Sequence, residues 1–300
     1  MRRYSKIFAL SSSLTLPIFL FNCKKDVSKD SSSTTSATQV SDAGPYYGAE
    51  MRTKNGYGTM DKALRVTWRA KPAKGNCSIT LLSLFNADRI FSTNQGAWSE
   101  ITFEIFNGAA TAPYKGDFQT QFITRASPNA PATQRGKGHD KLHKRGGNVP
   151  NVWDGKFHDF QVEWMPSTSD NAYLAFFIDG KEIRREKGGD LKFLEGNLDI
   201  YSAAWMSKKI GQPNSWGCVD NSPRIASTAL ILDNFKVEQQ NGKTWGVLEE
   251  RSFANAADIQ AFDLSDWSFE SFDGKYCPAN VVHQAGSEIR LELDKKCGPG

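Results

Sequence analysis

The 300-residue chain lacks the patterns that mark several large protein classes. No convincing long amphipathic helix appears, which argues against an all-α fold. The apolar stretch at residues 7 to 21 is short and interrupted by serines, so it makes a poor membrane span. The net charge is only +4, and nothing in it requires a nucleic-acid partner.

Closely spaced cysteine pairs are also missing, which argues against a structural zinc site. An even number of cysteines follows the N-terminal segment, and in an exported chain this favours two disulfides with three pairings open. These four residues are Cys77, Cys218, Cys277 and Cys297. His139 and His143 lie four apart in RGKGHDKLHKRGG, which we expect to be a basic surface loop and not a metal site.

The first 43 residues are typical of an exported, tethered protein. Residues 1 to 22 combine early basic residues with an apolar stretch, as a secretion signal does. The stretch ends in LFNC, which resembles a relaxed bacterial lipobox in which Asn22 replaces the usual small residue. Cys23 would then be lipidated; a plain signal peptide cleaved elsewhere is the alternative. Residues 23 to 43 are rich in Ser, Thr, Asp and Lys and predict a flexible tether. We therefore expect lipid anchoring to a bacterial membrane, on its periplasmic or cell-surface side.

Short apolar runs separated by turn residues dominate the rest of the chain. They predict an all-β fold, a sandwich of two antiparallel sheets, within a single domain at 44–300. The expected strands lie at 64–68, 78–85, 99–106, 118–124, 157–164, 172–179, 198–205, 229–238 and 287–293. The Asp-Gly pair in IDGKEI predicts a tight hairpin, and NAADIQAF predicts a turn or short helix.

The run WSEITFE, residues 98 to 104, is the strongest functional signal. In an extended chain Glu100, Thr102 and Glu104 point to one face. Their outer Cα atoms would be roughly 13 Å apart, and side chains leaning together would leave the carboxyl groups about 5 Å apart, a retaining glycosidase spacing. Less lean would give the inverting spacing, so the geometry alone leaves both open. An ordinary solvated strand face is the bland alternative.

Several segments in order resemble glycoside hydrolase family 16, the laminarinase, lichenase and xyloglucan transglycosylase group. They are GYGTMDKALRVTWRAKPAKG, WSEITFE, FHDFQVEW followed by FFIDGKEI, and LDIYSAAW. The resemblance runs from about Tyr46 to Glu238 and implies a jelly roll of the concanavalin A type. Residues 251–300 resemble the segment with which family members begin, so the resemblance also implies a circular permutation. On that alignment Cys277 and Cys297 fall near a lichenase disulfide, which leaves Cys77 with Cys218.

The resemblance assigns catalytic roles to the glutamates. Glu100 matches the nucleophile and Glu104 the general acid/base. Thr102 stands where family members usually carry Asp. Its hydroxyl could still donate a hydrogen bond to Glu100, but it cannot carry charge at neutral pH, so the enzyme activity is open.

Other residues match substrate or ion positions of the family. Trp98 and Trp205 are candidates for stacking on sugar rings, with core packing as the alternative. Glu50 and Arg52 match a polar pair at the substrate site, or form a surface ion pair. Gln121 matches a substrate-site glutamine, whereas Ile123 replaces a polar residue. No cofactor is required, and Asp233 with Gly286 lies where some relatives hold a structural calcium.

The sequence therefore predicts a lipid-anchored β-glucan hydrolase or transglycosylase, expected to be monomeric, with β-linked polysaccharide as its partner and no nucleic acid. The alternative is a carbohydrate-binding surface lipoprotein with weakened catalysis. The sequence leaves the sugar and its linkage open.

Overall fold

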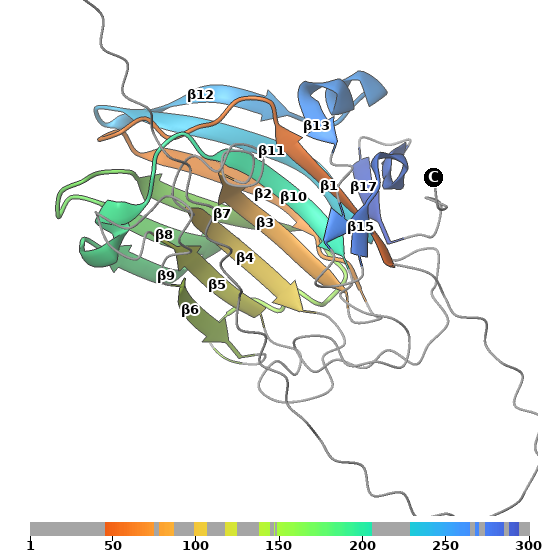
Figure 1. The fold of residues 1–300 in the computed structure, drawn as a ribbon, viewed down its shortest axis with the longest axis horizontal. Helices are drawn as coiled ribbons and strands as arrows, with labels where there is room; N and C mark the ends of the chain where they lie inside the picture. Colours follow the sequence, from red (N-terminus) through yellow and green to blue (C-terminus); the bar gives the residue numbers. More distant parts are fainter. Residues whose placement is uncertain are drawn as a thin grey trace, which may run out of the picture. The chain divides into compact units, whose positions relative to one another are not determined.

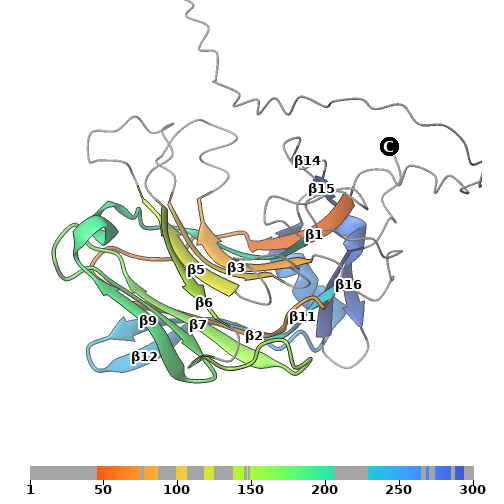
Figure 2. The same ribbon diagram turned by 90° about the horizontal axis from the view of Figure 1, so that it is seen from below.

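The computed structural model describes residues 46–74, 78–86, 99–106, 118–124, 138–144, 147, 149–205, 229–264, 268–269, 274–284 and 288–293. In these residues two sheets, mostly antiparallel, pack face to face (Figure 1, Figure 2). The predicted all-β sandwich is confirmed. No helix among these residues is both long and apolar enough to cross a membrane.

The nine-stranded sheet carries the strand with the two candidate glutamates. Its order is β14-β15-β1-β10-β3-β4-β5-β6, and β13 pairs with β1. The bounds are β1 Tyr46–Thr53, β3 Ile79–Phe85, β4 Glu100–Phe106, β5 Phe118–Ile123, β6 Gly138–His143, β10 Asp199–Trp205, β13 Phe262–Leu264, β14 Ser268–Phe269 and β15 Gly274–Tyr276.

The eight-stranded sheet covers the other side of the core. Its order is β16-β17-β11-β2-β7-β8-β9, and β12 pairs with β11. The bounds are β2 Leu64–Lys71, β7 His158–Met165, β8 Tyr173–Ile178, β9 Lys181–Lys187, β11 Ala229–Asn241, β12 Thr244–Arg251, β16 Val281–Gln284 and β17 Glu288–Glu292. Short 3-10 helices lie at η1 Gly189–Phe193, η2 Ala256–Ala261 and η4 Pro278–Asn280.

Strand β4 shows how the sequence sets both the core and the candidate site. Alternate residues of a strand point to opposite faces, and Ile101, Phe103 and Ile105 are buried in the core between the sheets. The Phe103 ring meets Phe160 and Phe176 of the facing sheet edge-on, at centroid distances of 5.4 and 5.1 Å. Each such ring contributes about 1.5 to 3 kcal/mol by burial. The core thereby fixes the glutamates on the outer face.

The predicted strands and the hairpin are present, with small shifts at their ends. Asp179 and Gly180 have φ values of 50° and 74°, as a tight turn between β8 and β9 requires. The expectation of a loop around His139 and His143 was wrong: these residues belong to strand β6, which pairs with β5. The glycines beside this segment suggested a loop, but the segment pairs with β5 and forms the last strand in the order of the sheet.

The C-terminal segment contributes to both sheets. β13 and β15 pair with β1, and β17 pairs with β11. These pairings tie β13, β15 and β17 to strands from earlier in the chain. The single domain at 44–300 stays a prediction. The circular permutation itself stays a prediction.

Candidate functional site

Three cross-strand rows line the outer face of the nine-stranded sheet around strand β4. Each row follows the register of paired residues from strand to strand. The middle row is Arg52, Tyr201, Ser83, Thr102, Gln121 and Asp140. The row of the acid/base candidate is Glu50, Ala203, Leu81, Glu104, Gln119 and Leu142. The row of the nucleophile candidate is Asp199, Phe85, Glu100, Ile123 and Gly138.

This register brings most of the predicted site residues together. Glu100 and Glu104 are both half-buried and share the outer face with Glu50, Arg52 and Gln121. They come from strands β1, β4 and β5, which are far apart in the sequence. Register therefore assembles acidic, amide and guanidinium groups in three adjacent rows across the sheet.

Thr102 lies between the two glutamates and is fully buried. Its hydroxyl donates to the backbone carbonyl of Phe103 at 3.3 Å. The expected hydrogen bond to Glu100 is not formed within the part of the chain that the structure describes. A buried hydroxyl needs an acceptor, and a neighbouring carbonyl of its own strand supplies one.

Gln119 is a site residue that the sequence reasoning missed. Its side-chain amide donates to Oε2 of Glu104, its cross-strand partner. Only 8% of Gln119 is exposed, so the amide is held against the carboxyl group and fixes the orientation of one oxygen. The signal was the alternation in FQTQFIT, which places both glutamines on one face, but the pairing partner required the register.

Gln121, the predicted substrate-site glutamine, donates its amide to Oδ1 of Asp140 on the edge strand β6. Asp140 is exposed and was not predicted, because its segment had been expected to form a loop. The pair adds a second amide and carboxylate group to the same face, one strand further from Thr102.

Glu50 and Arg52 lie at the opposite side of this face, on β1. Glu50 is 5% exposed, and Nη1 of Arg52 donates to the Tyr201 hydroxyl at 3.4 Å. Burial raises the pKa of Tyr201 well above its usual range, although the Arg52 contact opposes the shift. Tyr201 therefore stays a neutral hydroxyl that can exchange hydrogen bonds with a polar ligand.

Trp205 lies in a second apolar cluster, separate from the main core. It packs with Ile79, Phe106 and Ala203, and Leu81 lies against them. The indole is 7% exposed, so its contacts here are those of packing. A stacking role for Trp205 stays a prediction.

Several predicted residues lie outside the described residues. They are Cys23, Cys77, Trp98, Cys218, Gly286 and Cys297. Cys277 is buried and disulfide-bonded, but its pairing with Cys297 stays a prediction.

Asp233, the calcium candidate, receives a hydrogen bond from Nε of Arg69 to its Oδ2 at 2.9 Å. In the part of the chain with described coordinates, no group of three or more His, Cys, Asp or Glu side chains is arranged to hold a metal. The guanidinium thus takes up one carboxylate oxygen that a cation would need.

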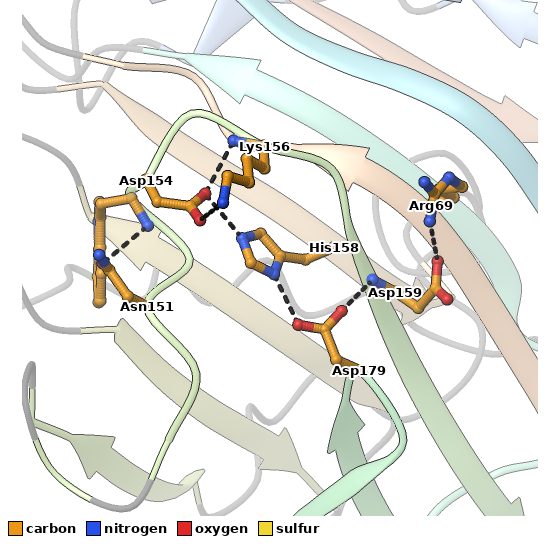
Figure 3. Close-up of polar contacts among 8 residues, drawn as sticks. Arg69, Asn151, Asp154, Lys156, His158, Asp159 and Asp179 are labelled. Atoms are coloured by element: carbon orange, nitrogen blue, oxygen red, sulfur yellow. Dashed lines mark hydrogen bonds and ion pairs between the residues drawn. The ribbon is translucent and has the colours of Figure 1, made fainter.

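A polar cluster around His158 lies on the eight-stranded sheet, apart from these rows (Figure 3). Its Nδ1 lies 2.7 Å from Oδ2 of Asp179, and its Nε2 lies 3.1 Å from Oδ1 of Asp154. The backbone amide of Asp159 donates to the other oxygen of Asp179. These contacts tie the segment before β7 to the β8–β9 turn, which is a structural role.

The comparisons with known proteins find similarity in sequence and in fold. No protein-family model matches the chain. It is similar to a β-glucanase of Fibrobacter succinogenes, with 25% identity over 111 residues, which are 37% of this chain and 26% of that protein. The chain thus spans only this fraction of the curated relative.

Solved structures with a similar fold include a lichenase from a mouse hindgut metagenome, at 21% identity and TM-score 0.38, covering 58% of this chain and 64% of that one. An endo-β-1,3-glucanase from Pyrococcus furiosus gives 12% identity and TM-score 0.42, with coverages of 67% and 75%. Crh5 transglycosylase gives 14% identity and TM-score 0.37, with coverages of 71% and 74%.

Proposed function

We propose that the protein is a retaining endo-acting β-glucan hydrolase or transglycosylase. The observation that carries this proposal is the placement of Glu100 and Glu104 on one face of β4, within rows of groups that can bond sugar hydroxyls. The ordered segments that resemble glycoside hydrolase family 16 and the curated β-glucanase relative support it. The proposal needs no metal or cofactor in the reaction.

The two glutamates divide the reaction between them. Glu104 donates a proton to the glycosidic oxygen while the Glu100 carboxylate attacks the anomeric carbon, so that the glycosidic bond breaks and a glycosyl ester forms. Glu104 then removes a proton from water, or from a sugar hydroxyl in transfer, and this oxygen displaces Glu100. Gln119 donates to Oε2 of Glu104 and thereby orients that carboxyl group.

The proposal also places the protein at a membrane through a lipid on Cys23. The LFNC segment and the Ser/Thr-rich residues that follow support it. Palmitate labelling of the chain in a bacterial host should mark the wild type and not Cys23→Ala. Equal labelling of the two would contradict the anchor.

The activity is tested by incubating the purified chain with laminarin, lichenan and xyloglucan. Shortened or rearranged oligosaccharides should appear, with retained anomeric configuration by NMR, and Glu100→Gln should abolish them. Glu163→Gln is the matched control, because Glu163 lies on the eight-stranded sheet and pairs with Arg65. Absence of turnover on a broad glycan panel would remove this function.

The second candidate is a carbohydrate-binding protein without catalysis. The Thr102 hydroxyl favours it, because this group donates to the Phe103 carbonyl and, unlike a carboxyl group, cannot share a proton with Glu100 at neutral pH. Glycan binding without turnover would support this function, and gain of turnover in Thr102→Asp would identify a decayed enzyme.

A further inference from the structure

A buried polar cluster lies at the point where strands β3 and β4 separate, directly before Glu100. It consists of Asn86 and Ser99, both with no exposed surface, and Glu195, which is half-buried. Asn86 follows the last residue of β3, Ser99 precedes the first residue of β4, and Glu195 comes from the segment between η1 and β10. We refer to these three residues as the β4 clamp.

Four hydrogen bonds join the clamp. The backbone amide of Asn86 donates to the backbone carbonyl of Ser99 at 3.3 Å. The backbone amide of Ser99 donates to Oδ1 of the Asn86 side chain at 3.0 Å. The Asn86 side chain in turn donates from Nδ2 to Oε2 of Glu195 at 3.3 Å. The Glu195 backbone amide donates to the Ser99 hydroxyl at 2.9 Å.

The Asn86 side chain replaces a backbone acceptor in the ladder between the two strands. In a regular antiparallel pair, two residues exchange backbone bonds in both directions. Here one of the two acceptors is a side-chain oxygen, so the pairing of β3 with β4 can end at Asn86 and Ser99 without leaving the buried Ser99 amide unbonded. The last fixed backbone unit before Glu100 is therefore held by Asn86.

Glu195 links this unit to a third segment. Its carboxylate accepts from Asn86 and its backbone amide reaches Ser99, so one residue closes the cluster from both sides. Hydrogen bonds with a charged partner are roughly twice as strong as neutral ones. The cluster consequently resists both sliding and rotation of the backbone that carries Glu100.

We propose that Asn86, Ser99 and Glu195 position Glu100 for its attack. The inference rests on the proposed function, since it concerns the nucleophile of that reaction. The clamp residues are positioning residues: they act on the backbone at Ser99, and Glu100 acts on the sugar. A displacement of a reacting group by about 1 Å can cost about a hundredfold in rate, so a fixed backbone next to the nucleophile has a direct kinetic value.

The test compares disruptive and conservative changes at the same positions in the full chain. Asn86→Ala removes two of the four bonds, and Ser99→Ala and Glu195→Ala remove one each. We expect kcat on lichenan or laminarin to fall between tenfold and a hundredfold, on the order expected for a misplaced group, with KM changed by less than about threefold because binding contacts lie elsewhere. Glu195→Gln and Ser99→Thr keep an acceptor and should restore most of kcat.

The control is Ser167→Ala. Ser167 is also buried, and its hydroxyl bonds Asp61 and Ser169 and no clamp residue. It should lose stability to a similar extent, measured by urea unfolding, and keep its kcat. If Ser167→Ala and Asn86→Ala lost kcat equally, the clamp would be general structural support and the inference would be overturned.

Hydrogen exchange separates this inference from the proposed function. The peptide that contains residues 99 to 106 should exchange faster in Asn86→Ala than in the wild type, by at least tenfold, whether or not the wild type turns over glucan. Equal exchange overturns the clamp. Faster exchange with an unchanged kcat overturns its positioning role. If the wild type showed no turnover, the proposed function would be wrong. The exchange rates would then still show whether the β4 clamp stabilises the backbone of β4.

Discussion

The outer faces of the two sheets both carry charged side chains but pair them differently. On the eight-stranded sheet, carboxylates meet cations: Arg65 contacts Glu163 at 2.7 Å, and Arg69 contacts both Asp159 and Asp233, at 3.2 and 2.9 Å. On the nine-stranded sheet, Glu104 and Asp140 are bonded by the neutral amides of Gln119 and Gln121.

This difference in partners distinguishes an ordinary solvated sheet face from the proposed active-site face. Half-exposed ion pairs keep a sheet face solvated and contribute little stability, typically 0 to about 1 kcal/mol each. An amide partner orients a carboxylate without cancelling its charge. The same residue types thus serve solubility on one sheet and, in the proposed reaction, chemistry on the other.

The largest expected effect comes from Glu104→Gln. Glucan hydrolysis should fall by a hundredfold or more, on the order of a lost general acid. An aryl β-glucoside oligomer with an acidic phenol leaving group should be far less affected in glycosyl-ester formation, because its oxygen needs no protonation. Steady-state kinetics with both substrates measures the contrast. Equal losses with both would contradict the assignment of Glu104 as acid.

The next largest effect should come from a change in the core between the two sheets. Phe103→Ala removes the ring that lies against Phe160 and Phe176, and should destabilise the fold by about 3 to 5 kcal/mol through lost burial and a cavity. Val247→Ala is the control, because Val247 is 52% exposed on β12 and its loss should cost less than about 0.5 kcal/mol. Urea unfolding monitored by tryptophan fluorescence compares the two variants.

The edge strand β6 carries a residue, His143, that should make the stability of the fold depend on pH. Burial lowers the pKa of His143 to about 4, with Lys141 and Arg184 adding to the shift. The unfolded chain binds this proton near pH 6.5 and the folded chain does not, so stability is complete above pH 6.5 and falls as the pH drops toward 4. The loss should reach up to about 3 kcal/mol.

His143→Gln is the matched variant for this effect. It keeps a polar partner for Thr120, which the imidazole contacts at 3.0 Å, but removes the titration. Its stability should change less between pH 6.5 and 4 than that of the wild type, as measured by urea unfolding at each pH. If the free energy of unfolding of the two proteins changed equally with pH, His143 would not cause the pH dependence.

The smallest effect concerns the ion pair of Arg69 with Asp233. Both side chains are partly exposed, so Asp233→Asn should cost less than about 1 kcal/mol. The pair also sharpens the calcium question, because the guanidinium holds an oxygen that Ca²⁺ would use. Calcium should raise the melting temperature of Arg69→Ala more than that of the wild type. Equal shifts would mean that Arg69 does not compete with the ion.

The sequence predicted the sandwich and the glutamate strand because both depend on alternation, which local residues carry. The alternation of apolar and polar residues in SEITFEIF predicts which side chains face the core. The contact of Phe103 with Phe176 of the facing sheet agrees with this assignment. The partners of Glu104 and Gln121 could not be predicted, because they depend on register between strands. Strand β6 was missed because its residues are polar and flanked by glycines, so that only the free edge of β5 makes it a strand.

The pairing of β1 has a consequence for how the chain is made. Tyr46, at the start of the described chain, pairs with Gly274 near its other end, and Thr53 pairs with Phe262. A nascent chain cannot complete this edge until residues 262 to 276 have been synthesised. The β1 edge therefore closes late in the order of the chain, and a chain truncated after Arg251 would expose the backbone groups of β1 and β11 that β13, β15 and β17 normally bond.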